Sequence, residues 1–364
     1  MDLELSDEQV WIEESLGTLL ARQWPPAQEA WKAGDAERAR LWESLVEFGL
    51  LTGAGNDLGA IELCLAARGI GAHLASVPLL GSVGVRYALA PYAADLPAGV
   101  RAVLESDASI SIALLEPGGD WSVSSTRARV ESNRLTGRKA AVEHASGVEH
   151  LAVVALVDGE PGLALVRTGT RGLELTPQTA LDDTVPLSGA TFVEATAETV
   201  GDRELAEAIV ERLVNVSGLL AAAESVGAAG AIFDQARRYA AERRQFGRTI
   251  GSNQALRHLL ADLHVRQASG WSTTLYAAAA LDDGMPGARQ TASVAKAYMS
   301  RAAREVAHGA IQVFGGIAFT EEHPAHRFLR RIIVREQQFG DAAHHERELG
   351  RWLAAGATRE RIAV

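Results

Sequence analysis

The sequence is short of cysteine and of aromatic residues, and each shortage narrows the possible folds. Cys64 is the one cysteine among 364 residues, so no disulfide forms within the chain. It lies in an apolar helical stretch, where a buried structural thiol is expected. No Cys/His spacing resembles a zinc site, and no metal is predicted. Aromatic residues make up 5% of the chain, while Ala and Gly are abundant, which favours closely packed helices.

Basic residues are fewer than acidic ones, 35 against 46, which gives a formal net charge of −11. An acidic chain is a poor general nucleic-acid binder, because phosphate neutralisation requires a basic face. The apolar runs, such as residues 219–223, are far below the ~18 residues that cross a bilayer. The N-terminal string MDLELSDEQV is acidic and resembles no signal peptide. We therefore expect a cytoplasmic protein without a membrane span.

Residues 1–105 are predicted to form a helical domain. Ser6 followed by Gln9 is typical of a helix N-cap, and Pro25–Pro26 ends the first helix. Helical periodicity then predicts helices over Arg38–Leu50, Leu58–Ala72 and Leu79–Leu89.

Residues 106–198 are predicted to form a β-domain, a sandwich or a barrel. Short apolar runs bounded by Gly, Asp and Pro predict strands at Ser109–Leu115, Leu151–Val157 and Leu163–Val166.

Residues 199–364 return to helical periodicity. Long helices with few breakers are predicted from Leu205 to about Glu242, then over Ser252–Leu281, Gln290–Phe314 and His323–Leu353. Helices of this length suggest a four-helix bundle. The predicted fold class is therefore α+β and multidomain, in the order helical, β, helical.

The string YAAERRQFGRTIG at residues 239–251 is the first specific signal. An Arg such as Arg243 binds pyrophosphate well, a Phe such as Phe246 can pack on adenine, and Gly247 lets backbone approach phosphate. Basic residues at a helix C-terminus are the simpler alternative. The string resembles the acyl-CoA dehydrogenase motif YxxxRxQFGxxIxxxQ. The resemblance implies that Arg243, Gln245 and Phe246 contact the flavin nucleotide of a neighbouring subunit.

A second string, QVFGGIAFTEEHP at residues 312–324, is followed by Arg327 and Arg330–Arg331. It resembles the QxxGGxGFxxExPxxRxxRD segment of the same family. The resemblance implies that Gln312, Gly315 and Gly316 admit flavin adenine dinucleotide (FAD) close to backbone. The preceding helix carries Lys296 and Ser300, which is also family-like. The two motifs follow each other in family order, and together with the order of domains the resemblance covers essentially the whole chain.

The resemblance implies α,β-dehydrogenation of an acyl-CoA thioester, in which a carboxylate removes the α-proton and the flavin takes a hydride. Most members carry this base as a Glu after the RxxRD stretch. Here the neighbouring aromatic matches Phe339, and the Glu position falls on Gly340. In a minority the Glu precedes RxQFG, and that position falls on Ser217. Neither residue is a carboxylate.

Other side chains near these positions leave alternatives open. Asp341 follows Gly340, and a shifted loop would deliver it as a base, as in a nitroalkane-oxidase branch of the superfamily. An Asp in a Gly-Asp pair is otherwise turn or helix-cap chemistry. Glu224 lies a turn or more beyond position 217. His344 and His345 are expected on a helix surface.

The predicted β-domain departs from the family where members hold their own flavin ring. The family segment TEPxxGSD corresponds to LEPGGDW, ending at Trp121. The family segment WIT or WIS corresponds to a stretch in which Val142 or Glu143, and His144, replace Trp and Thr. The residues that would hold this chain's own ring are thus lost.

The resemblance therefore predicts an asymmetric role. The features that contact a neighbour's cofactor are kept, and those for catalysis are lost. The chain is similar to the base-lacking, β-like subunit of actinobacterial α2β2 acyl-CoA dehydrogenases, enzymes of lipid metabolism that act on steroid side-chain CoA thioesters. A paralogous partner would then supply the base. A self-sufficient, homo-oligomeric flavoenzyme using Asp341 and a non-enzymatic acyl-CoA-binding protein remain as alternatives.

Overall fold

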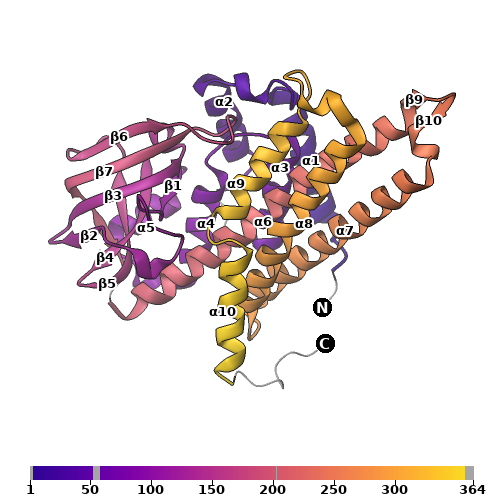
Figure 1. Ribbon diagram of the computed structural model, residues 1–364. Helices are drawn as coiled ribbons and strands as arrows, with labels where there is room; N and C mark the ends of the chain where they lie inside the picture. Colours follow the sequence, from indigo (N-terminus) through magenta and orange to yellow (C-terminus); the bar gives the residue numbers. More distant parts are fainter. Residues whose placement is uncertain (1–2, 52–57, 202, 357–364) are drawn as a thin grey trace. The chain divides into compact units, whose positions relative to one another are not determined.

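The computed structural model describes residues 3–51, 58–201 and 203–356. Figure 1 shows helices at both ends of the chain and strands in its middle, so the predicted fold class is confirmed. Internal contacts divide the chain into two compact units, residues 1–33, 64–75 and 218–364, and residues 34–63 and 76–217. This division differs from the three predicted domains, 1–105, 106–198 and 199–364, whose boundaries stay a prediction.

The first unit begins with helix α1 (Asp7–Gln23), which starts at the predicted cap. The Ser6 hydroxyl accepts a hydrogen bond from Gln9 N–H at 3.2 Å, and the Gln9 side chain accepts one from Ser6 N–H at 3.0 Å. A short 3-10 turn, η1 (Ala30–Lys32), and helix α3 (Ala60–His73) follow.

The unit is completed by the end of α6 (Arg203–Glu242) and by four further helices: α7 (Gln254–Asp282), α8 (Ala288–Phe314), α9 (Ala325–Gln337) and α10 (Ala342–Ala354). Two glycines let α3 and α6 approach each other closely. A Cβ at Gly227 would lie 1.8 Å from the Arg68 carbonyl oxygen, and one at Gly71 would lie 2.0 Å from that of Glu224.

Helix α6 is long and apolar enough, over Leu205–Glu242, to cross a membrane by length and composition. However, 89% of its most apolar window is buried within the fold, as in a core helix. The long helix predicted from Leu205 to about Glu242 is thus confirmed. Its apolar character over this length is not evident from uninterrupted apolar runs, because single polar residues interrupt them.

The single helix predicted over His323–Leu353 is wrong, because the chain turns between α9 and α10. Gln338 is extended, while Phe339 and Gly340 have positive φ values of 57° and 99°. Asp341 then caps the new helix by accepting a hydrogen bond from His344 N–H at 2.7 Å. Between α9 and α10, only Gly340 and Asp341 are residues that commonly interrupt helices.

The second unit carries helices α2 (Asp35–Glu47), α4 (Leu79–Leu89) and α5 (Ala98–Glu105), of which α5 was not predicted, together with the start of α6. Arg86 of α4 is buried, and its guanidinium donates to backbone carbonyls at the end of α5, including those of Ser106 at 2.7 Å and Ala108 at 2.8 Å. Burial lowers the pKa of Arg86 to about 10.

The predicted β-domain is one eight-stranded mixed sheet with the order β6-β7-β3-β2-β4-β5-β8, and β1 pairs in parallel with β4. Its apolar face packs around Leu135, Val153 and Phe192, all buried. The strands are β1 (Ile110–Ala113), β2 (Arg129–Glu131), β3 (Arg134–Glu143), β4 (His150–Val157), β5 (Glu160–Arg167), β6 (Leu173–Gln178), β7 (Leu187–Thr196) and β8 (Glu198–Val200).

Candidate functional site

The first motif forms an arm at the far ends of α6 and α7 (Figure 1). Strands β9 (Arg244–Gln245) and β10 (Arg248–Thr249) pair antiparallel, and Phe246 and Gly247 make the turn between them. Both turn residues have positive φ, 52° and 81°, as tight hairpin turns require. A bulky side chain in this conformation is strained, and such strain is commonest where a segment has a function.

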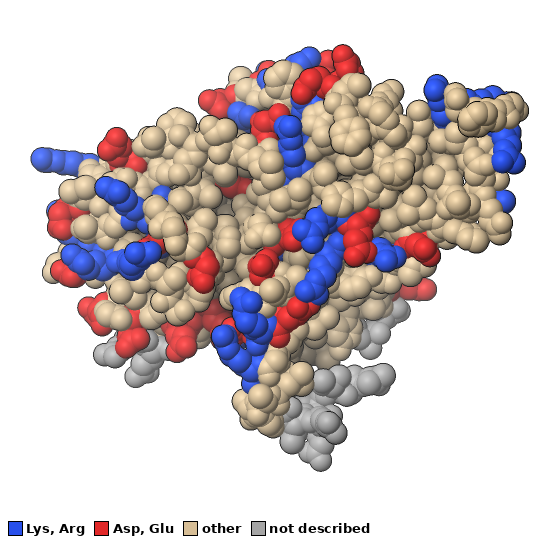
Figure 2. All heavy atoms as spheres, in the orientation of Figure 1, with Lys and Arg blue, Asp and Glu red and all other residues tan. Residues whose placement is uncertain are grey.

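Every residue of the arm from 241 to 248 is exposed. The Phe246 ring is 99% exposed, an extreme value for a large apolar side chain. Lys and Arg side chains gather at this tip in Figure 2, in keeping with the exposed Arg243, Arg244 and Arg248. The arm therefore offers an aromatic face beside several positive charges.

The second motif lies beside the first. The Phe314 ring, at the end of α8, contacts Tyr239 of α6 and His323, with ring centroids 5.4 Å and 4.3 Å apart. Gly315 then turns the chain with φ 66° and ψ −141°, a conformation that is essentially limited to glycine. The structure thus brings the two sequence motifs together at one end of the helices.

The residues of both motifs fit a dinucleotide that approaches from outside the chain. Gln312, Gly315 and Gly316 are exposed, as are Arg243, Gln245 and Phe246. A Cβ at Gly315 or Gly316 would meet nothing within 4 Å, so backbone is open to a ligand there. Guanidinium groups suit a diphosphate, and the Phe246 face suits an adenine. These are the six positions that the sequence assigned to the cofactor.

The two base positions carry no carboxylate, and both are buried away from solvent. Gly340 has φ 99°, and a Cβ there would lie 2.5 Å from the His344 ring. Ser217 on α6 is fully buried, and its hydroxyl has no hydrogen-bond partner among the described residues. The preceding residue Phe339 is not acidic either, so a shift by one position on that side supplies no base.

Asp341 is engaged as the N-cap of α10, through its hydrogen bond with His344 N–H. The prediction of surface positions for both histidines is wrong for His345, which is 4% exposed. Its Nε2–H donates to the Phe339 carbonyl at 3.0 Å. Burial, followed by Lys296 and His344, lowers the pKa of His345 to about 3.

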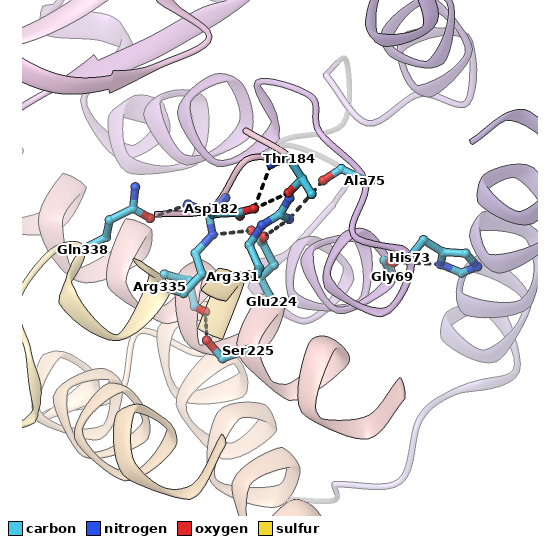
Figure 3. Close-up of polar contacts among 11 residues, drawn as sticks. Gly69, His73, Ala75, Asp182, Thr184, Glu224, Ser225, Arg331, Arg335 and Gln338 are labelled. Atoms are coloured by element: carbon cyan, nitrogen blue, oxygen red, sulfur yellow. Dashed lines mark hydrogen bonds and ion pairs between the residues drawn. The ribbon is translucent and has the colours of Figure 1, made fainter. Parts of the chain in front are cut away.

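Glu224 is a fully buried carboxylate of the helical unit, and two arginines contact it (Figure 3). Its oxygens lie 2.7 Å from Arg331 Nη1 and 2.9 Å from Arg335 Nε. Arg331 Nη1 also donates to the Ala75 carbonyl at 3.1 Å. A carboxylate between two guanidinium groups is a structural tie rather than a free base.

The β-domain has a buried ion pair near the segments where family members are expected to hold their flavin ring, but Val142 and His144 there are buried. Lys139, buried in β3, donates to Glu116 at 2.9 Å, and Glu116 also accepts from Ala128 N–H at 2.8 Å. Burial alone would raise the pKa of Glu116, but hydrogen bonds from Ala128, Lys139 and Arg127 hold it below its ordinary value. Val142 is fully buried in the sheet core, and His144 is buried with φ 54°. Neither side chain is presented as an exposed ring contact.

Comparisons with known proteins identify the family of the chain. The family model described as acyl-CoA dehydrogenase, C-terminal domain, matches residues 207–354. The acyl-CoA dehydrogenase FadE27 of Mycobacterium tuberculosis is 30% identical over 336 residues, which cover 86% of this chain and 88% of FadE27. The acyl-CoA dehydrogenase IpdE2 of Mycolicibacterium smegmatis is 34% identical over 174 residues, so the chain spans 51% of that relative and the match covers 48% of the chain.

Solved structures share the fold over almost the whole chain. A variant of the Tcur3481–Tcur3483 steroid ACAD has a TM-score of 0.85 at 26% identity, covering 96% of this chain and 99% of that one. The ChsE4–ChsE5 complex from Mycobacterium tuberculosis also has a TM-score of 0.85, at 24% identity, covering 97% and 99%. At that identity the second likeness concerns the fold alone.

Proposed function

The chain belongs to the acyl-CoA dehydrogenase family, and from this premise we propose that it is a base-lacking subunit of a heteromeric, FAD-dependent acyl-CoA dehydrogenase. Its arm and its paired glycines complete the FAD site of a paralogous subunit. That partner supplies the carboxylate base. The description of one similar structure as a steroid ACAD supports a steroid side-chain CoA thioester as the substrate.

The observation that carries the proposal is the contrast between the two halves of the site. Phe246 is 99% exposed in a strained turn, among exposed arginines, whereas Gly340 and the buried Ser217 stand where the family has its base. An exposed aromatic ring in a strained conformation is stabilised when another molecule covers it. The exposed residues that would contact a partner's cofactor are thus intact, whereas the catalytic base that this chain would need for itself is missing.

The roles of this chain's residues follow from their chemistry. Bound FAD supplies the acceptor for the hydride that leaves the β-carbon of the acyl group. Arg243 neutralises diphosphate charge, and Phe246 covers an adenine face. Gly315 and Gly316 admit the dinucleotide close to backbone.

The flavin-to-protein ratio tests the proposal. It is measured from the absorbance spectrum of the chain purified alone and again after co-expression with an acyl-CoA dehydrogenase paralogue. We expect a colourless chain alone and, in a symmetric α2β2 complex with a shared site, about half a flavin per chain. About one flavin per chain in the protein purified alone would overturn the proposal. A colourless complex would also overturn it, and would favour a non-enzymatic acyl-CoA-binding role.

A self-sufficient flavoenzyme with Asp341 as base is distinguished by one conservative change. Asp341→Asn keeps the helix cap, since Asn caps as well as Asp, but removes any basic carboxylate. If the chain provides the base, this variant loses turnover while keeping flavin. The capping hydrogen bond to His344 instead favours unchanged turnover of the complex. Asp341→Ala serves as the control for the cap itself and should cost about 1 kcal/mol of stability.

A further inference from the structure

Lys296 of α8 is buried, and the three donors of its protonated form are all used. Its side chain is 1% exposed, and its ammonium donates to the carbonyls of Arg335 at 2.9 Å and Glu336 at 2.8 Å and to the Ser300 hydroxyl at 3.2 Å. Both carbonyls belong to the last turn of α9, which has no partners for them within the helix. Lys296 therefore caps α9 from a neighbouring helix and, when protonated, places its charge at the negative end of the helix dipole.

The segment 338–341 that follows this cap is strained. Phe339 is a bulky residue in the left-handed region, with φ 57°, and Gly340 continues there with φ 99°. Such a conformation persists only where the surroundings hold it. On its far side, His345 Nε2–H donates to the Phe339 carbonyl and Asp341 caps α10. On its near side, Lys296 fixes the segment through its hydrogen bonds to the end of α9.

The groups around the ammonium leave it without a close counter-ion. Glu336 and Asp341 attract it and Arg335 repels it, but burial outweighs all three and lowers the pKa of Lys296 to about 7. The Glu336 carboxylate is itself paired with Arg304 of α8 at 3.2 Å, and burial raises its pKa.

The other two elements that pack here bring no charge to offset that of the lysine. Gly218 of α6 lies against it, since a Cβ there would be 3.9 Å from Lys296 Cγ. His345 of α10 is neutral above its pKa of about 3.

We propose that Lys296 is the positioning residue of the segment 338–341, and that this segment opens with uptake of a proton by Lys296. When the end of α9 moves off α8, the amine meets water and binds a proton with its ordinary affinity. The open state therefore holds more protons than the closed one between neutral pH and the ordinary lysine pKa. Linkage then favours opening as the pH falls through this range and has no effect below it.

Hydrogen–deuterium exchange of the full chain tests this inference. Protection of the amides in residues 336–345 is followed from about pH 6 to about pH 9 and corrected for intrinsic exchange. We expect protection to rise with pH above about 7, by up to about tenfold per pH unit, and to stay constant below about pH 7. Protection that does not change above about pH 7.5 would overturn the inference.

Three variants separate this role from a merely structural one. Lys296→Met removes the proton site, and Lys296→Arg stays charged in both states, so each should abolish the rise in protection. Lys32→Met, which changes a lysine whose side chain is 57% exposed, should keep it. If Lys296→Met does not fold, Lys296→Arg decides, and a wild-type slope in it would overturn the inference.

The inference rests on the proposed function in one respect: the segment 338–341 contains Gly340, where the family has its catalytic base. The two tests fail separately, because exchange is measured on the chain alone whereas the flavin ratio requires the partner.

Discussion

Arg331 of α9 donates a hydrogen bond to Glu224 of α6 at 2.7 Å, and both side chains are fully buried. Arg335, one turn along α9, reaches the other carboxylate oxygen at 2.9 Å. Arg331 stands at the Asp position of the family's RxxRD motif, so the sign of the charge is reversed there. In this chain one carboxylate on α6 fixes the position of α9, and thereby of the segment that follows it.

Glu224→Leu should destabilise the chain strongly, because it leaves Arg331 and Arg335 buried without their carboxylate. Breaking a buried pair in this way costs about 3–5 kcal/mol. Urea unfolding followed by circular dichroism measures the loss. Glu305→Leu, which removes an ion pair with Arg266 in which the Glu side chain is 55% exposed, should change stability by less than about 1 kcal/mol. Equal effects of the two changes would contradict the role of Glu224 as a tie.

Gly340→Glu should not create an active enzyme, although it restores a Glu at the predicted base position. Its Cβ would meet the His344 ring at 2.5 Å, and its φ of 99° is unfavourable for any side chain. We expect no acyl-CoA oxidation by the chain alone and a stability loss of more than about 1 kcal/mol. Gly350→Glu on α10, where a Cβ meets nothing within 4 Å, is the control for the added charge. Dehydrogenation by the Gly340 variant would mean that the segment opens easily.

The sequence predicted elements whose signals are local. The Ser6 capping box, helix α4 and strand β4 follow from a few neighbouring residues, and the structure confirms them. The exposed motif at Phe246 was likewise recognisable in the sequence, because its residues are consecutive.

What the sequence did not reveal depends on distant partners. The break between α9 and α10 has only Gly340 and Asp341 as local signals, whereas Lys296 and His345 hold it from other helices. Glu224 and Arg331 lie 107 residues apart, so no periodic pattern in the sequence indicates that they pair. His345 was expected on a helix surface but is buried, because burial depends on tertiary packing.

The pair formed by Glu116 and Lys139 should give the sheet unit an acid-sensitive contribution to stability. The pKa of Glu116 lies below its ordinary value of 4.5, so the folded state favours the charged form. This contribution is present above about pH 4.5 and is lost as the pH falls through the lower folded-state pKa.

Glu116→Gln should therefore lower stability at neutral pH, and the difference from wild type should narrow as the pH falls below the ordinary carboxyl range. Unfolding midpoints in urea across an acid pH series measure this. Glu131→Gln, with a side chain 78% exposed, is the matched control and should show no such trend. A constant difference at every pH would show that the lost hydrogen bonds, and not the charge, matter.

Phe246→Ala should weaken flavin retention by the complex without weakening the chain itself. The ring is 99% exposed, so its removal exposes no core, and Ala relieves some of the crowding of a bulky residue at positive φ. Loss of one aromatic stacking contact to an adenine costs about 1–3 kcal/mol, which corresponds to roughly 5- to 150-fold weaker FAD binding. Titration of FAD into the apo complex measures the affinity, and thermal unfolding of the chain alone should stay unchanged. Val265→Ala, at a residue 61% exposed on α7, controls for the loss of any exposed apolar side chain. Unchanged FAD affinity in the Phe246 variant would mean that the arm serves contact between subunits and not the nucleotide.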